Sequence, residues 1–291
     1  MKKIDRRSFI KTLALLSMIP ILGAVSRVPV IKAAIEDSQV KKRKENTNTE
    51  NTPHIADGIG TQVDSNKKFG MVIDVGACVG CRRCQYGCKA ENNIPDSISP
   101  PWIEIFRLDE QEGVLAFPTI EELKAGVTTQ YEVSPEEGKW YLPIQCNHCE
   151  NPPCVKVCPT GATYQDEDGL VLMDYDKCIG CRFCVVACPY SNRRFNWVRP
   201  DIPEEDINRI VPIRTVGVAE KCTFCVHRTR DGKLPRCVLV CPTQARHFGD
   251  LNDPESEVSK LIHENLSFRL LEELGTEPDL YYITRGKKYR G

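Results

Sequence analysis

The cysteines of this chain fall into four groups of four. Each group begins with C-x-x-C and has three residues before its last cysteine, and only the middle gap varies, between two and eleven residues. We name these groups the first to fourth quartets. Their members are Cys78, Cys81, Cys84 and Cys88; Cys146, Cys149, Cys154 and Cys158; Cys178, Cys181, Cys184 and Cys188; and Cys222, Cys225, Cys237 and Cys241. This is a fourfold internal repeat of a ligand pattern.

Three chemistries use cysteines at close spacings: disulfides, zinc sites and iron–sulfur clusters. Zinc usually takes two ligands from each of two separate knuckles, whereas the third quartet, in KCIGCRFCVVACPYSNRRF, has three cysteines within seven residues. The bacterial ferredoxin run C-x2-C-x2-C-x3-C-P has this form: three of its cysteines bind one [4Fe–4S] cluster and the fourth ligates the neighbouring cluster. Proline follows Cys158, Cys188 and Cys241 here, but not Cys88.

Disulfides remain an alternative, because sixteen cysteines is an even number and the chain carries the features of an export signal. Disulfide pairing does not explain why three residues separate the third and fourth cysteines in all four quartets. The pattern therefore favours iron–sulfur clusters over both disulfides and zinc.

The first 33 residues have the features of a twin-arginine signal peptide. DRRSFIK contains Arg6 and Arg7, and the largely apolar run from Leu13 to Val25 is short for a membrane span. An ordinary secretory signal or an uncleaved anchor is the alternative. The twin-arginine route exports folded proteins, which suits a protein whose clusters are inserted in the cytoplasm. We therefore expect a periplasmic protein, or one on the outer face of the cytoplasmic membrane.

Residues 34–67 contain KKRKENTNTENT and almost no apolar periodicity, so we predict a flexible linker there. The whole chain has 39 Lys and Arg against 40 Asp and Glu, and residues 1–33 contain seven of the basic residues and one acidic residue. The remainder is therefore acidic, with a formal charge of −7. This balance argues against a nucleic-acid-binding role for the basic run from Lys41 to Lys44.

A strand-like run precedes each quartet, and the residues after each third cysteine suit a short helix. The runs are FGMVIDVGA, KWYLPIQ, GLVLMDYDK and VPIRTVGVAEK. The nineteen residues between Cys158 and Cys178 resemble the spacing inside one two-cluster ferredoxin. We predict an α+β fold of tandem, nested two-cluster ferredoxin-like units with long loop insertions. Its four-cluster domain spans 68–250, with an inner unit at 145–190, an outer unit at 68–90 with 212–245, and a C-terminal tail with a short helix at 251–291.

Two long loops separate the quartets. Residues 89–145 contain an apolar strand-like run from Trp102 to Leu108 and a helical turn, IEELKAG, and residues 189–221 contain the polar segment RPDIPEEDIN. Insertions of this kind usually form docking surfaces for partners. We expect Trp102, Trp140 and Trp197 to cover apolar core rather than to lie on an electron path.

Several side chains near the cysteines are candidates for tuning the clusters. Arg82, Arg83, Arg182 and Arg228 lie between or just beyond ligands, where a positive charge favours a reduced cluster, although exposed arginines are commonly just solvated. His148, inside C-N-H-C, is a candidate proton relay, although a histidine between two ligands more often packs or donates a hydrogen bond. We find no P-loop, no Rossmann fingerprint, no nucleophile elbow and no H-E-x-x-H motif, and therefore expect no catalytic site.

Four such quartets, the eleven-residue gap in the last one and the twin-arginine leader resemble the iron–sulfur electron-transfer subunits of the polysulfide reductase and dimethyl sulfoxide reductase type. The resemblance covers residues 68 to about 250. Beyond it, FGDLNDPESEVSKL and LLEELGTEPDLYYI resemble the tails of relatives in sulfite-reduction-linked quinone complexes and in alternative complex III.

The resemblance implies four [4Fe–4S] clusters in which paired quartets exchange their fourth cysteines. The implied ligand sets are Cys78, Cys81, Cys84 and Cys241 for cluster 1; Cys146, Cys149, Cys154 and Cys188 for cluster 2; Cys178, Cys181, Cys184 and Cys158 for cluster 3; and Cys222, Cys225, Cys237 and Cys88 for cluster 4. The missing proline after Cys88 departs from the pattern and affects only the local turn.

The expected function is that of a non-catalytic electron-transfer subunit. Its expected partners are an integral membrane quinone-interacting subunit and a larger molybdopterin-containing or cytochrome c redox subunit, with membrane contact only through a partner and no nucleic acid. The alternative is a free-standing periplasmic polyferredoxin shuttle. A purely structural metal or disulfide protein is a third possibility. The long insertions and the tail favour a subunit, because a shuttle needs little beyond its cluster core.

Overall fold

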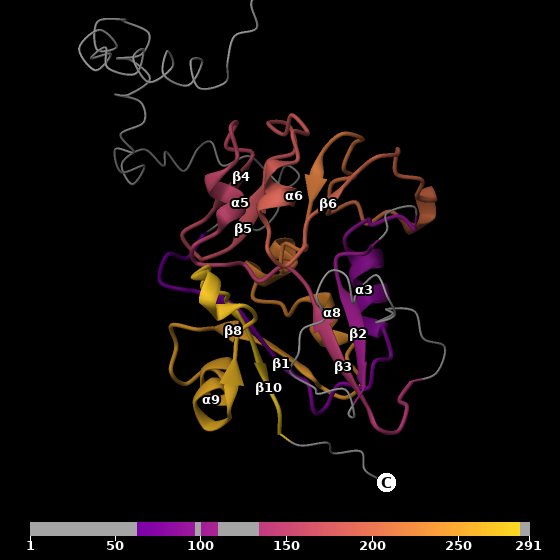
Figure 1. The fold of residues 1–291 in the computed structure, drawn as a ribbon. Helices are drawn as coiled ribbons and strands as arrows, with labels where there is room; N and C mark the ends of the chain where they lie inside the picture. Colours follow the sequence, from indigo (N-terminus) through magenta and orange to yellow (C-terminus); the bar gives the residue numbers. More distant parts are fainter. Residues whose placement is uncertain (1–62, 97–99, 110–133, 286–291) are drawn as a thin grey trace, which may run out of the picture. The chain divides into compact units, whose positions relative to one another are not determined.

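The computed structural model of the protein describes residues 63–96, 100–109 and 134–285 (Figure 1). The predicted signal peptide at 1–33, most of the predicted linker and the helical turn IEELKAG lie outside these residues. In the described part, no helix has the length and the apolar character that crossing a membrane requires.

The largest sheet has four strands in the order β8-β1-β10-β9. Its strands are β1 (Phe69–Asp74), β8 (Arg246–Asp250), β9 (Ser267–Phe268) and β10 (Leu280–Ile283). β1 pairs antiparallel with β8 and parallel with β10, with Met71 opposite Leu280. The predicted strand before the first quartet is thus present as β1. The segment that we predicted as a tail contributes two strands to the same sheet, so it is an integral part of the fold around the first quartet.

Three two-stranded antiparallel sheets complete the strand structure of the described residues. They pair β2 (Glu104–Asp109) with β3 (Lys139–Ile144), β4 (Thr163–Gln165) with β5 (Val171–Met173), and β6 (Arg194–Phe195) with β7 (Ala219–Glu220). The runs predicted before the second and third quartets correspond to β3 and β5. The run before the fourth quartet is a strand only at its last residues, because Pro212 and Gly217 interrupt VPIRTVGV.

Short helices carry the third cysteine of every quartet. Cys84 lies in α3 (Arg83–Glu91), Cys154 in α5 (Pro153–Lys156), Cys184 in α6 (Phe183–Ala187) and Cys237 in α8 (Arg236–Leu239). α3 packs against α8, and α5 packs against α6 (Figure 1). The helix of the first quartet therefore packs against that of the fourth, and the helix of the second against that of the third. The other helical elements of the described residues are α7 (Val226–Thr229), α9 (Glu257–Glu264) and the 3-10 turns η4 (Glu204–Asp206) and η5 (Glu272–Leu274).

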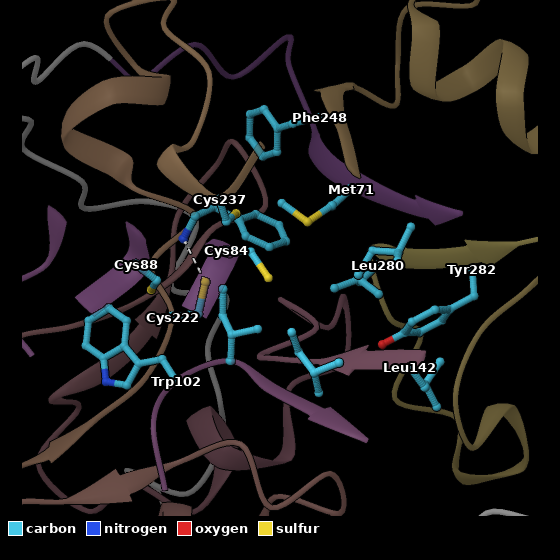
Figure 2. Packing of buried hydrophobic residues seen from close by; sticks show 14 of the residues in the cluster. Met71, Cys84, Cys88, Trp102, Leu142, Cys222, Cys237, Phe248, Leu280 and Tyr282 are labelled. Atoms are coloured by element: carbon cyan, nitrogen blue, oxygen red, sulfur yellow. Dashed lines mark hydrogen bonds between the residues drawn. The ribbon is translucent and has the colours of Figure 1, made fainter. Parts of the chain in front are cut away.

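The main apolar core lies between the four-stranded sheet and the β2–β3 hairpin. Met71, Leu280 and Tyr282 from the sheet are fully buried in it, together with Trp102. Figure 2 shows Leu280, Tyr282 and Leu142 at one end of this cluster and Cys84, Cys88, Cys222 and Cys237 at the other. The core thus ends directly on the cysteines. The mixed fold of helices and small sheets confirms the predicted α+β class.

The three tryptophans have different roles. Trp102 is buried and donates from Nε1 to Oε1 of Glu220 over 2.8 Å, and Trp140 packs partly buried against the main core. Trp197 is 67% exposed and lies edge-on to Phe195, with the guanidinium of Arg182 over its ring. The prediction that all three cover core is therefore wrong for Trp197.

Candidate iron–sulfur sites

The loop of every quartet turns at the residue before the second cysteine. That residue has a positive φ in all four quartets: +69° at Gly80, +45° at His148, +68° at Gly180 and +52° at Phe224. The left-handed conformation reverses the chain within three residues, which is what allows the first two cysteines to face a common point. Glycine adopts it without cost, whereas histidine and phenylalanine need surrounding contacts to hold it.

The first three cysteines of the first quartet line one cavity together with Cys241 of the fourth. Ile105, Pro143 and Arg246 complete its wall. Burial raises the pKa of Cys78 to about 12, with the thiols of Cys84 and Cys241 adding to the rise. Cys241 accepts a hydrogen bond from the backbone N–H of Ala245 over 3.2 Å. Four thiols from two distant segments therefore share one enclosed space.

Cys88 lies instead among the first three cysteines of the fourth quartet. Burial raises its pKa well above the ordinary value, and the neighbouring thiols of Cys222, Cys225 and Cys237 raise it further. The side-chain amide of Asn92 lies 3.6 Å from the sulfur of Cys88 and 3.7 Å from that of Cys225. This group thus has one cysteine from the first quartet and three from the fourth.

The second quartet has a cysteine of the third quartet among its neighbours. Burial raises the pKa of Cys149, and the thiols of Cys146, Cys154 and Cys188 add to the rise. Burial also raises the pKa of Cys188, and the thiols of Cys146 and Cys154 add to the rise. Cys188 therefore lies with the second quartet rather than only with its own.

The remaining group has one buried and three partly exposed cysteines, as the first group does. Burial raises the pKa of Cys184, and the thiols of Cys154 and Cys178 add to the rise, while Cys178, Cys181 and Cys158 are partly exposed. Burial alone would raise the pKa of Cys158, but backbone N–H groups of Thr163, Thr160 and Ala162 lower it, which favours the thiolate form that binds metal.

The donor sets fit iron–sulfur clusters. None of the sixteen cysteines forms a disulfide. Among the described residues, no three His, Cys, Asp or Glu side chains converge closely enough to hold a single metal ion; in the first group the thiols surround a cavity instead. Thiolates around an enclosed apolar space, with N–H groups directed at sulfur, are the surroundings in which [4Fe–4S] clusters are held.

His148 has a packing role. Its Nδ1 accepts from the backbone N–H of Val171 over 3.1 Å, so its Nε2 carries the proton and donates to the carbonyl of Cys222 over 3.0 Å. Burial, with the charge of Lys221, lowers its pKa well below the ordinary value. Both nitrogens are thus committed to the backbone, and the proton-relay interpretation is wrong.

The four arginines that we singled out for tuning are dispersed. Arg83 is exposed, Arg182 stacks on Trp197, and Arg228 binds Glu91 at 3.2 Å. Arg82 lines the cavity of the first group.

Two other arginines, Arg193 and Arg246, are buried among the thiols, and our sequence reasoning missed them. The signal that marks them is their identical spacing, five residues after Cys188 and Cys241. They are therefore better placed to influence the clusters than Arg83, Arg182 and Arg228, whereas Arg82 lines the same cavity as Arg246.

Comparison with known proteins gives the class. Residues 138–203 and 210–251 match the 4Fe-4S dicluster domain. The chain is 46% identical over 215 residues to the putative dimethyl sulfoxide reductase iron-sulfur subunit of Halobacterium salinarum, a match that covers 74% of this chain and 78% of the relative. The chain belongs to the family of iron–sulfur subunits of reductase complexes, and it is therefore an electron-transfer protein that carries [4Fe–4S] clusters.

Two further relatives place it within that family. The menaquinone reductase iron-sulfur cluster-binding subunit of Nitratidesulfovibrio vulgaris is 38% identical over 247 residues, covering 75% of this chain and 89% of the relative. One of the chains of polysulfide reductase from Wolinella succinogenes is 36% identical over 220 residues, covering 75% of this chain and 94% of the relative. The predicted resemblance to the polysulfide and dimethyl sulfoxide reductase type is confirmed.

Proposed function

We propose that the sixteen cysteines hold four [4Fe–4S] clusters and that each pair of quartets exchanges its fourth cysteine. The ligand sets are those implied by the resemblance, with Cys241 completing the first set, Cys88 the fourth, Cys188 the second and Cys158 the third. The resulting fold is an inner two-cluster unit nested inside an outer one. When bound, each such cluster takes up and releases one electron.

The observation that carries this proposal is the cavity shared by Cys78, Cys81, Cys84 and Cys241. Cys241 is more than 150 residues from Cys84 in the chain, and it is the last rather than the first member of its quartet. The neighbours of Cys88 and Cys188 follow the same rule, and so do the packed helix pairs α3 with α8 and α5 with α6. For Cys158, the assignment follows from the repeat.

The four sets form a continuous series in this proposal. Cys222 of the fourth set is buried in the main core, and Cys146 of the second set packs against the same cluster. After burial, the thiol of Cys146 is the largest influence that raises the pKa of Cys222. The outer and inner units therefore approach each other through these two cysteines. The series then runs from the first set through the fourth and second to the third.

We further propose that the protein is a subunit on the outer face of the cytoplasmic membrane, between a quinone-interacting membrane subunit and a molybdopterin-containing or haem-containing partner. The relative named menaquinone reductase supports a quinone-linked role. Exposed apolar side chains gather in sequence around the third quartet and support docking: Ile179, Phe183, Val186, Trp197 and Val198 are between 50% and 85% exposed. A polyferredoxin shuttle is the alternative, and such side chains make it less suitable as a free protein.

The test is purification of the complex from solubilised membranes. We expect the chain to copurify with an integral quinone-interacting subunit and a larger redox subunit, and to contain about sixteen irons and sixteen sulfides when four clusters are bound. The chain alone should accept electrons from dithionite yet turn over no substrate and oxidise no quinol. Quantitative recovery as a free soluble monomer supports the shuttle instead. A colourless protein loaded with zinc excludes both.

A further inference from the structure

An arginine follows the last cysteine of the third and fourth quartets at the same spacing. Arg193 stands five residues after Cys188, and Arg246 five residues after Cys241. Each side chain is only 3% exposed. Two buried guanidinium groups at equivalent positions of an internal repeat indicate a shared role.

Arg246 lies between the first and fourth ligand sets. Its Nη1 donates to Oε1 of Gln145 over 2.6 Å and lies 3.7 Å from the sulfur of Cys237, in the fourth set. Arg246 also lines the same cavity as Cys84, in the first set. Burial raises the pKa of Cys84, and the charge and hydrogen bonding of Arg246 oppose that rise. One guanidinium therefore reaches the third cysteine of both quartets, whose side chains Figure 2 shows next to each other.

Arg193 repeats this arrangement between the second and third sets. Its Nη2 donates to Oγ1 of Thr163 over 2.5 Å, and its Nη1 lies 3.0 Å from the sulfur of Met173. Met173 packs with Cys154 and Cys184 in one buried cluster, so the guanidinium lies beside both cysteines. Burial alone would lower the pKa of Arg193, but these two thiols raise it above the ordinary value. These two are again the third cysteines of their quartets.

Neither guanidinium has a carboxylate partner among the described residues. Other buried arginines do: Arg194 binds Glu104 at 2.6 Å and Arg214 binds Glu220 at 2.8 Å. Nε of Arg193 and Nη2 of Arg246 are buried and have no hydrogen-bond acceptor in the described part of the chain. A buried charge without a counter-charge is strongly destabilising, so the counter-charge must come from the ligand sets themselves.

We propose that Arg193 and Arg246 are shared counter-ions, each serving one pair of clusters and raising the reduction potentials of both members of that pair. Arg246 serves the first and fourth sets, and Arg193 serves the second and third. A thiolate-ligated [4Fe–4S] cluster is an anion and gains one more negative charge on reduction, which a fixed buried cation stabilises. The proposal rests on the four ligand sets proposed above. These arginines are positioning residues, because they act on the clusters through the cysteines.

The experiment is a potentiometric titration of the full, cluster-loaded chain, followed by electron paramagnetic resonance. In Arg246→Gln, we expect the reduction equilibrium constants of two clusters to fall about tenfold, which is about 59 mV for a one-electron couple. In Arg193→Gln, the reduction equilibrium constants of the other two clusters should fall by a similar factor. Arg→Lys at either position keeps the charge and should leave the potentials close to those of the wild type. Arg199→Gln removes an exposed charge six residues from Arg193, and it should leave all four reduction potentials unchanged.

If a glutamine variant shifts all four potentials by the same amount, or shifts no potential, the pairwise counter-ion role is wrong. If a glutamine variant loses iron, the lysine variant decides: retained iron with near-native potentials supports the role of charge, whereas lost iron shows that the arginine only fills space. The wild-type iron content and number of signals test the four ligand sets separately. Fewer than four clusters in the wild type therefore contradicts the proposed function, and four clusters with the wrong pairing of shifts contradicts this inference alone.

Discussion

The imidazole of His148 lies flat against the ring of Phe224, with the ring centroids 3.9 Å apart and the planes inclined by 15°. The two residues occupy the same position, just before the second cysteine, in the second and fourth quartets. Both have a positive φ. The stack therefore joins two loops of the repeat at their turning points and brings Cys222 toward Cys146.

Replacing Phe224 by alanine should destabilise the protein strongly. Phe224 is 0% exposed and also contacts Phe248 edge-on, so truncation leaves a cavity under both rings. We expect a loss of about 3–5 kcal/mol in the free energy of unfolding, measured by anaerobic urea denaturation. Phe183→Ala, which truncates a side chain that is 58% exposed, should change it by less than about 0.5 kcal/mol. Equal effects of the two substitutions would show that the stack does not hold the loops together.

Gly180 should not tolerate alanine. It has φ +68°, and a Cβ there would lie 2.3 Å from the carbonyl oxygen of Gly217, which is backbone and cannot move aside. We expect Gly180→Ala to lose the iron of one cluster, measured as iron per chain. The matched control is Gly232→Ala: φ is +73° there, and a Cβ would meet no described atom within 4 Å. It should cost only the left-handed strain of about 1–2 kcal/mol. Full iron content in Gly180→Ala contradicts this account of the third loop.

Cys188→Ser tests the exchange of ligands. Cys188 ends α6, which packs against α5 and its Cys154. We therefore expect damage to the cluster of the second quartet, while Cys178, Cys181 and Cys184 keep their own fourth ligand. Cys158→Ser is the reciprocal variant and should damage the cluster of the third quartet. Paramagnetic signals with the opposite assignment would show that each quartet closes on its own cluster.

Replacement of Arg6 and Arg7 by lysine should keep the folded protein in the cytoplasm with its iron content unchanged, because we predict that DRRSFIK is a twin-arginine signal and such a signal requires both arginines. Cell fractionation with an iron assay measures both. Continued export of the double variant would show that DRRSFIK is not a twin-arginine signal.

The sequence was informative where the pattern is local. β1 and β3 follow from FGMVID and KWYLPI, because apolar and β-branched residues bounded by polar ones favour strands. The pairing of Leu280 with Met71 was not visible, since it joins segments about 200 residues apart. Burial could not be predicted either, because nothing in the sequence distinguishes buried Arg193 from exposed Arg199. The shared spacing from cysteine to arginine can be interpreted only because the structure places both guanidinium groups among thiols.

β10 pairs in parallel with β1 and supplies the inner partner of the strand that leads to Cys78. The ribosome releases β10 about 200 residues after β1, so β1 has no neighbour on this side while the intervening chain is made. The second and third quartets, at 146–188, emerge together long before that point. Chain synthesis therefore lets the second and third quartets mature first, and the sheet beside the first quartet closes only after residues 280–283 have been made.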